Sequence, residues 1–242
     1  MLSLSQHARL EALVELQKQG TPLAHLTGRQ RFMGLELLSS PEALIPRKET
    51  EILATAAIEK ILHAAEKQRA LVMDVCTGCG NIALACAAAV PNARVLAADL
   101  SEQAVSLAGR NAREHGLSGR VEFHCGDLFA PFQTPEFIGQ VDVITCNPPY
   151  ISTAKVSKMP REIAGHEPQL AFNGGPLGVS ILMRVITHGP ALLKRGGWLG
   201  FEVGMGQGPA MERRLRESDV FSQVETCTDA ANHIRALFGQ KR

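Results

Sequence analysis

An apolar, β-branched run, residues 141–146 (VDVITC), leads directly into Asn147-Pro148-Pro149-Tyr150. The run is typical of a buried parallel strand. Neither proline has an N–H to give to a neighbouring strand, so the strand must end there. Because ligands of open α/β sheets bind at the carboxyl ends of strands, this corner is the first candidate site.

The residue types at this corner suit chemistry on a planar nitrogen. The side-chain carbonyl of Asn147 and the backbone carbonyl of Pro148 can each accept a hydrogen bond from an NH₂ group. Two fixed acceptors aim the nitrogen lone pair at an electrophile, and Tyr150 can stack on the flat group. These three are the candidate catalytic residues. Taken alone, the pattern is also compatible with a strand that simply ends in an asparagine turn.

A second informative stretch lies about seventy residues upstream. The apolar residues 70–75 run into the loop Cys76-Thr77-Gly78-Cys79-Gly80, and a helical pattern follows. This order predicts the first strand, turn and helix of a Rossmann-like unit, in which glycines let the backbone approach a ligand. The loop matches neither G-x-G-x-x-G nor the P-loop, which argues against a dinucleotide and against a P-loop nucleotide site.

Two acidic residues follow the next two predicted strands. Asp99 ends a strand about twenty residues after the glycine loop, where a carboxylate can accept hydrogen bonds from both ribose hydroxyls. As an isolated residue it would simply cap the next helix. Asp127 and Leu128 come after the third strand and suit an adenine, with the carboxylate accepting from the exocyclic amine and the apolar side chain covering the ring. The pattern therefore predicts a nucleoside site.

The flanking segments suggest a cap and a lid. We expect residues 3–19 to form an amphipathic helix that packs on the domain as a cap. A β-hairpin is expected around Gly34, and Thr50 is expected to cap a helix over 51–66. The polar stretch after Tyr150 has the length of an active-site lid, in which His166 and Glu167 are expected to be solvated.

The remaining elements complete the predicted domains. We expect a helix over 178–194, a strand over 197–203, and two late strands near 223–228 and 233–238 that form an antiparallel edge hairpin. Residues 1–52 are predicted to form the helix and hairpin cap, and residues 53–242 the catalytic domain.

Composition excludes several classes of protein. The chain has 242 residues, with 25 basic and 24 acidic side chains and a net charge of +1. This balance gives no electrostatic footprint for nucleic acid or a membrane surface. No apolar run reaches membrane-spanning length and no signal-peptide core is visible, so a cytoplasmic location is expected. Cys76 and Cys79 form the one C-x-x-C among six cysteines, so no metal is predicted.

Together these motifs resemble a class I S-adenosylmethionine-dependent methyltransferase that acts on nitrogen. More closely, the chain from about Pro22 onward resembles the HemK/PrmC family of protein-glutamine methyltransferases. The markers are Gly28, Phe32, residues 45–47 and 49–51, residues 74–80, residues 147–150, Glu167-Pro168, Gly174-Gly175 and Glu202. The resemblance implies an α/β, Rossmann-like fold with a seven-stranded, mostly parallel sheet and an antiparallel C-terminal strand.

The resemblance also implies roles for individual residues. Asn147 and the Pro148 carbonyl would hold the acceptor amide, Tyr150 would pack against it, and Phe32 would wall the site near the sulfonium. The methionine part of the cofactor would be held by the loop Cys76, Thr77, Gly78, Cys79 and Gly80. Asp99, with Leu100 beside it, would bind the ribose. Asp127 and Leu128 would surround the adenine.

Two features depart from the family pattern. Cys76 replaces a glycine of the cofactor loop, which we expect to reshape the methionine end of the pocket. Only about twenty residues precede Pro22, where release-factor-modifying members of the family carry a helical domain.

Several functions therefore remain open. The first is methylation of a protein glutamine amide. The second uses a small acceptor, or S-adenosylmethionine itself, whose α-amine would close an azetidine ring and release methylthioadenosine. The third is adenine-N6 methylation of nucleic acid, which the balanced charge argues against. The fourth is a non-catalytic cofactor-binding module.

Overall fold

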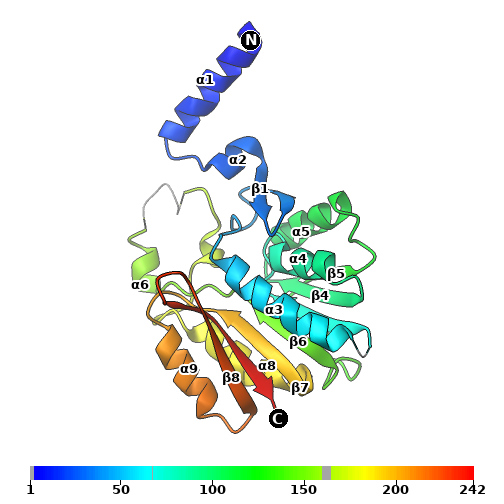
Figure 1. The fold of residues 1–242 in the computed structure, drawn as a ribbon. Helices are drawn as coiled ribbons and strands as arrows, with labels where there is room; N and C mark the ends of the chain where they lie inside the picture. Colours follow the sequence, from blue (N-terminus) through cyan, green and yellow to red (C-terminus); the bar gives the residue numbers. More distant parts are fainter. Residues whose placement is uncertain (1–2, 67, 160–164) are drawn as a thin grey trace.

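A single seven-stranded sheet organises the molecule (Figure 1). The computed structural model describes residues 3–66, 68–159 and 165–242. The strands lie in the order β5-β4-β3-β6-β7-β9-β8. Their bounds are Ala70–Val75 (β3), Ala93–Asp99 (β4), Val121–Cys125 (β5), Val141–Cys146 (β6), Leu193–Glu202 (β7), Phe221–Thr228 (β8) and Ile234–Lys241 (β9).

The pairing confirms the predicted sheet. Strands β5, β4, β3, β6 and β7 pair in parallel, whereas β9 runs antiparallel to both β7 and β8. The last two strands form the expected hairpin, but only β8 lies at the edge, because β9 is inserted between β8 and β7. The carboxyl ends of β3, β4 and β6 consequently meet at one rim of the sheet.

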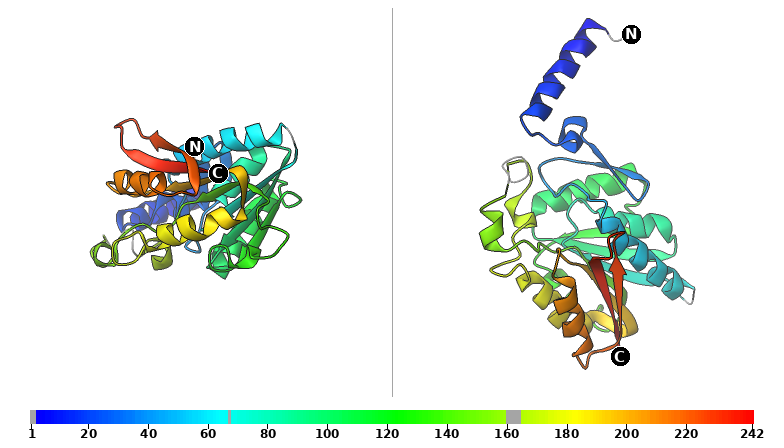
Figure 2. Two further views of the ribbon diagram at one scale, coloured as in Figure 1. Left: turned by 90° about the horizontal axis from the view of Figure 1, so that it is seen from below. Right: turned by 60° about the vertical axis from the view of Figure 1, so that its left-hand side comes forward.

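Helices cover both faces of the sheet (Figure 2). Helices α3 (Thr50–Ala65), α4 (Asn81–Ala89) and α5 (Glu102–Glu114) lie on one face, and α8 (Ser180–Leu192) and α9 (Gly208–Arg216) on the other. Strand side chains alternate between the two layers. Val72 packs under α4, for example, while Met73 joins the opposite cluster. Because both faces of the sheet are buried, the central strands are mostly apolar and do not alternate between apolar and exposed polar residues.

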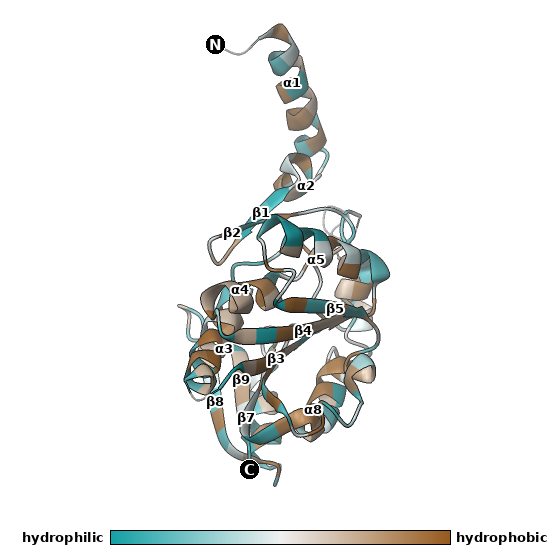
Figure 3. Cartoon of the chain, turned by 90° about the vertical axis from the view of Figure 1, so that its right-hand side faces the viewer, coloured by the Kyte–Doolittle hydropathy of each residue, from teal (hydrophilic) through white to brown (hydrophobic). Residues whose placement is uncertain are grey.

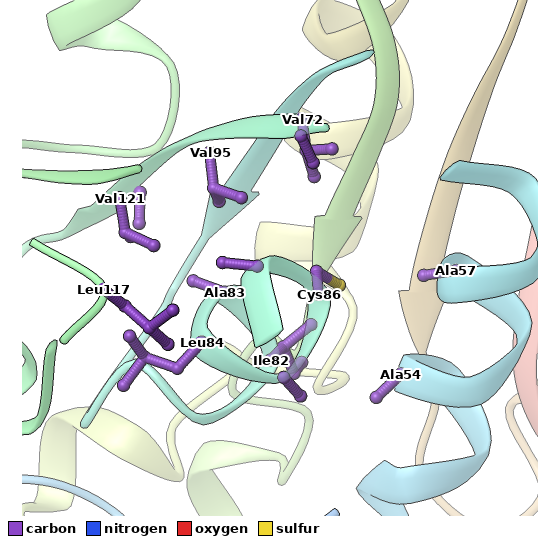
Figure 4. Close-up of a cluster of buried hydrophobic side chains, with 14 of the residues drawn as sticks. Ala54, Ala57, Val72, Ile82, Ala83, Leu84, Cys86, Val95, Leu117 and Val121 are labelled. Atoms are coloured by element: carbon purple, nitrogen blue, oxygen red, sulfur yellow. The ribbon is translucent and has the colours of Figure 1, made fainter. Parts of the chain in front are cut away.

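Alanine-rich α4 packs closely against the sheet and against α3, which lies beside it on the same face. Figure 4 shows Ile82 and Ala83 on this helix, near Val72 of the sheet and Ala54 of α3. Small side chains let the helix approach both neighbours, which brings its N-terminus, directly after the glycine loop, to the rim of the sheet.

One polar residue interrupts the apolar run of β6, and the structure explains it. Asp142 is 8% exposed and accepts a hydrogen bond from the Leu71 N–H (2.8 Å) and another from Lys194 Nζ (2.9 Å). A buried carboxylate that is paired in this way is compatible with a central strand.

The β-hairpin forms where it was predicted. It comprises β1 (Arg29–Phe32) and β2 (Leu35–Leu38) and follows the short helix α2 (Leu23–Thr27). The fully buried Asn111 of α5 ties the hairpin to the glycine loop, because it accepts from the Leu38 N–H (2.7 Å) and donates to the Cys79 carbonyl (3.0 Å). Phe32 of the hairpin shares a core cluster with α3 and α4, so the hairpin packs as part of that core.

Helix α1 (Leu4–Lys18) forms as predicted, but the expectation that it packs on the domain is wrong. The helix extends away from the sheet and contains no buried residue (Figures 1 and 3). Leu10 is 48% exposed and Leu16 is 44% exposed. Its apolar side chains are distributed around the helix instead of along one stripe, so no single face can be buried.

Thr50 does not cap α3 as expected. The N-cap residue is Glu49, which makes no capping hydrogen bond, and Thr50 is the first helical residue. Thr50 is 1% exposed, and its hydroxyl accepts a hydrogen bond from the side chain of Asn147 (3.2 Å). Its hydroxyl is therefore used for a contact across the rim of the sheet.

The connections between β5 and β6 and between β6 and α8 are long and mostly irregular. They contain η1 (Ala130–Phe132), α6 (Thr153–Val156) and η2 (Gln169–Ala171). Residues 160–164 of the predicted lid lie outside the described residues. Within the described ranges, no helix has both the length and the apolar character needed to cross a membrane.

A buried carboxyl connects the glycine loop to the strand that carries Asn147. Asp74, at 1% exposure, accepts a hydrogen bond from Thr77 Oγ1 at Oδ2 and from Thr145 Oγ1 at Oδ1, each 2.6 Å long. Burial raises the pKa of Asp74 to about 6, although both hydroxyls favour the ionised form. One side chain thus fixes the relative positions of the loop and the end of β6.

The raised pKa of Asp74 predicts a pH-dependent stability. The folded protein holds this proton up to about pH 6, whereas the unfolded chain releases it near pH 3.8. The contribution of Asp74 to the free energy of unfolding should therefore be greatest below about pH 4. It should fall by roughly 3 kcal/mol as the pH rises through 6. Urea denaturation of the wild type and of Asp74→Asn at several pH values in this range measures the change in the free energy of unfolding.

The Asp74→Asn profile should lack this decrease, because the amide has no proton to lose. Asp219→Asn, at an exposed position, is the matched control and should keep the wild-type profile. A decrease of the same size in Asp74→Asn would assign the pH dependence to other groups.

Candidate functional site

A cavity opens at the rim where β3, β4 and β6 end. It encloses about 1020 Å³ of empty space, including its open mouth. Its walls come from the glycine loop, the ends of the three strands, the segment 42–50 and the lid. The structure brings eight of the predicted site residues together in its lining: Cys76, Thr77, Gly78, Asp99, Leu100, Asp127, Leu128 and Asn147.

Five predicted site residues are placed elsewhere. Phe32 was expected to wall the site, but it is 1% exposed, because it packs into the core cluster that also contains residues of α3, α4 and α5. Cys79 is also buried, and burial raises the pKa of its thiol to about 12. At Gly80 a Cβ would lie 3.1 Å from Ala108 and 3.2 Å from Phe123, so this glycine serves the packing of α4.

Pro148 and Tyr150 are not among the residues that line the cavity. Pro148 is buried, and its neighbour Pro149 lines the cavity. The Tyr150 hydroxyl donates a hydrogen bond to Glu202 Oε1 (3.2 Å). Burial raises the pKa of Tyr150 to about 12 and also raises that of Glu202. The tyrosine therefore anchors the corner to the end of β7.

The Asp99 carboxylate connects the glycine loop to the start of α5. It accepts hydrogen bonds from the Gly78 N–H at Oδ2 (2.8 Å) and from the Ser101 N–H at Oδ1 (2.9 Å). Burial raises the pKa of Asp99, and these N–H groups oppose the shift. Each oxygen keeps a second lone pair for a ligand hydroxyl. The cap of α5 is Ser101, whose Oγ accepts from the Ala104 N–H (3.2 Å).

Gly78 leaves room for close approach of a ligand. Its φ is +55°, and a Cβ built there would meet no atom within 4 Å. The space in front of this residue is therefore open to the cavity.

Asp127 has a partner that the sequence did not indicate. Arg184 of α8 donates to Asp127 Oδ2 (2.7 Å), and both side chains are about half exposed. Next to it, Leu128 is 7% exposed and adopts φ +50°. An amine bound at this end of the cavity would share the carboxylate with Arg184.

Asn147 lines the cavity with its orientation already set. Its Nδ2 donates to Thr50 Oγ1 (3.2 Å), so the side-chain carbonyl remains as an acceptor. The sequence predicted Asn147, but it did not reveal that Thr50 would hold it. The signal in the sequence was the segment 49–51, which the resemblance marked without a role.

The lid is attached to the segment before α3. Glu167 was expected in a solvated pair, yet it is 6% exposed and accepts from the Ile45 N–H (2.9 Å) and from Arg47. The expectation was wrong because that buried N–H has no strand partner and needs an acceptor. Gly174 lets this segment approach the corner at residues 147–150 closely, since a Cβ there would lie 2.5 Å from the Pro149 carbonyl oxygen.

Metal chemistry has no support among the residues that the structure describes. No group of three or more His, Cys, Asp or Glu side chains there could hold a metal ion. The cysteines are free thiols.

Comparison with known proteins gives a consistent result. A family model described as a methyltransferase domain matches residues 72–166. The chain is 35% identical over 229 residues to the release factor glutamine methyltransferase of Moorella thermoacetica, covering 95% of this chain and 78% of the relative. It is 38% identical over 231 residues to that of Xylella fastidiosa strain 9a5c, covering 95% and 80%.

Solved structures share the fold at lower identity. The N-terminal domain of human METTL16 in complex with SAH superposes with a TM-score of 0.61 at 19% identity, covering 86% of this chain and 76% of that chain. The ribosomal protein L11 methylase of Lactobacillus delbrueckii subsp. bulgaricus has a TM-score of 0.57 at 23% identity, covering 83% and 82%. The fold is that of class I methyltransferases, and by its sequence the chain belongs to the release factor glutamine methyltransferase (HemK/PrmC) family.

Proposed function

We propose that this protein methylates the side-chain amide nitrogen of a glutamine in a protein release factor, with S-adenosylmethionine as the methyl donor. The observation that carries the proposal is the state of Asn147. Thr50 already binds its amino group, and its carbonyl remains at the cavity to accept from a substrate amide. The names of the relatives support a release factor as the acceptor. A cytoplasmic location, expected from the sequence, remains part of the proposal.

The residues that line the cavity fit the cofactor. The open space before Gly78 admits the methionine part beside Cys76, and the spare lone pairs of Asp99 suit ribose hydroxyls. Leu128 and Asp127 stand at the remaining end, as an adenine would require. When bound, S-adenosylmethionine supplies a methyl group on a positively charged sulfur.

The contribution of the protein is to position a poor nucleophile. The lone pair of an amide nitrogen is delocalised into the carbonyl, so the nitrogen reacts only if it is held close to the electrophile. The Asn147 carbonyl, together with that of Pro148, would accept the N–H groups of the substrate and stabilise the positive charge that develops on them. The proton can leave after methyl transfer, so this scheme needs no strong general base.

Competing functions give different products. A cyclase would release methylthioadenosine from S-adenosylmethionine alone, and the cysteine at position 76 is the feature that favours it. A small-molecule methyltransferase would produce S-adenosylhomocysteine without a protein. Mass spectrometry of S-adenosylmethionine incubated with the protein, with and without a release factor, separates them. S-adenosylhomocysteine that appears only with the release factor supports the proposal, and methylthioadenosine in its absence overturns it.

Replacement of Asn147 should damage catalysis more than binding. Asn147→Ala removes one of the two acceptors and should raise the barrier by roughly 2–4 kcal/mol, by analogy with the loss of one oxyanion-hole donor. Turnover would then fall about 30- to 1000-fold. Steady-state kinetics measures the turnover of the variant. Calorimetric titration with S-adenosylhomocysteine is the control that the cavity is intact. Turnover within threefold of wild type would rule out this role for Asn147.

Thr50 should act as a positioning residue for Asn147. Thr50→Val keeps the shape but removes the hydroxyl, and the lost hydrogen bond of about 1–1.5 kcal/mol should lower kcat roughly tenfold. Thr50→Ser retains the hydroxyl and should recover most of the turnover. Affinity for S-adenosylhomocysteine should change less than twofold in both. A serine variant as slow as the valine variant would show that the methyl group matters, and not the hydrogen bond.

A further inference from the structure

Two cysteines lie next to each other where the cofactor loop meets the catalytic corner. Strands β3 and β6 are neighbours at the centre of the sheet, and Val75 is the register partner of Cys146 (Figure 1). Cys76 is the next residue after Val75. Parallel strands lie about 4.8 Å apart and rise about 3.3 Å per residue, so the Cα atoms of Cys76 and Cys146 are roughly 5.8 Å apart. A disulfide requires about 4.4–6.8 Å.

The backbone turn at Cys76 places both cysteines on the same side of the sheet. In a regular strand, Cys76 would point to the face opposite Val75 and Cys146. Instead it adopts φ +58°, a left-handed conformation that L residues rarely adopt, and it packs against the same apolar cluster as those two residues. After burial, the neighbouring Cys76 side chain is a further cause that raises the pKa of Cys146, so the two side chains are close. Both are free thiols.

Only one of the pair is accessible. Cys76 lines the cavity and is partly exposed, while Cys146 behind it is fully buried. The Arg184 guanidinium lies near the Cys76 side chain. Burial raises the pKa of Cys146, and the charges of Asp74 and Asp99 add to this effect. This asymmetry is what a pair of attacking and resolving thiols requires.

We propose that Cys76 and Cys146 form a peroxide-reactive thiol pair that closes to a disulfide at the floor of the cavity. The Cys76 sulfur attacks one peroxide oxygen, the O–O bond breaks, and a sulfenic acid and water form. The Cys146 sulfur then attacks the sulfenic sulfur, the S–O bond breaks, and a second water leaves. Two thiols are thus oxidised while one hydrogen peroxide is reduced to two waters.

Disulfide formation would alter the cavity both at the cofactor loop and at the end of β6. The bond would draw Cys76 inward beside Thr77 and Gly78 and would fix it to the residue that precedes Asn147. We expect the oxidised protein to bind S-adenosylhomocysteine at least tenfold more weakly, and dithiothreitol to restore the affinity. A bound cofactor should in turn shield Cys76. This last expectation rests on the proposed function.

The test maps disulfides in the full-length protein. Purified protein is treated with hydrogen peroxide, with and without S-adenosylhomocysteine, then alkylated and digested with trypsin. Cys76, Cys79 and Cys86 share the tryptic peptide 70–94, and Cys125 and Cys146 share 121–155, so the linked peptides must be fragmented to assign the bond. We expect a Cys76–Cys146 bond that dithiothreitol reverses and that the ligand slows at least tenfold.

Two variants make the assignment specific. Cys146→Ser removes the resolving thiol, so peroxide should leave Cys76 as a sulfinic acid that dithiothreitol does not reduce. Cys125→Ser removes an exposed thiol outside the cavity and should form the linked peptide at the wild-type rate. A bond between Cys76 and Cys79, or oxidation confined to Cys125, would overturn the proposal.

Failure of the proposed function would look different. Calorimetry of S-adenosylhomocysteine with the reduced protein reports on the cavity independently of any thiol. Absence of binding there would remove the cofactor assignment, whereas the disulfide map would still decide the thiol pair. Binding without a Cys76–Cys146 bond would remove the thiol pair alone.

Discussion

The site depends on the two hydrogen bonds that the buried carboxyl of Asp74 accepts. Thr77 belongs to the loop beside the cavity, and Thr145 lies two residues before Asn147. Methyl transfer to a weak nucleophile requires donor and acceptor to be held in one frame, because small displacements are costly. A single carboxyl that grips both segments supplies that frame. Burial of Asp74 disfavours its charged form and so costs folding stability when the carboxyl ionises. We infer that the protein accepts this cost because Asp74 fixes the loop and the end of β6 relative to each other.

A second set of buried polar contacts attaches the chain before α3 to this frame. Thr50 receives the amino group of Asn147, and Glu167 of the lid accepts from Ile45 and Arg47. Asn111 fixes the hairpin to the glycine loop in the same way. These contacts connect elements that are far apart in sequence, and each satisfies a polar group that would otherwise be buried without a partner. The segment around Glu167 and the hairpin therefore belong to the same structural unit as the corner at Asn147.

The sequence was sufficient for features that local pattern controls. Apolar periodicity and prolines located β3, β6 and the corner at Asn147, and spacing placed Asp99 and Asp127 at the same rim. It was insufficient where tertiary contacts decide. Thr50 has the residue type of a helix cap, Glu167 that of a solvated loop, and Phe32 that of a pocket wall. Each has a different role, because the partner that determines it lies more than sixty residues away or in another layer. Helix α1 is the opposite case. Its local pattern predicted the helix correctly, but the helix packs on no surface of the domain.

The central claim is that this fold presents an amide nitrogen, and no other atom, to the methyl donor. The most direct measurement is to locate the methyl group after the protein has reacted with a release factor and S-adenosylmethionine labelled on its methyl carbon. Fragmentation mass spectrometry of the digested acceptor should find the label on the side-chain nitrogen of one glutamine. A label on a backbone atom or on any other side chain would contradict the positioning role of Asn147, and with it the function derived from this corner.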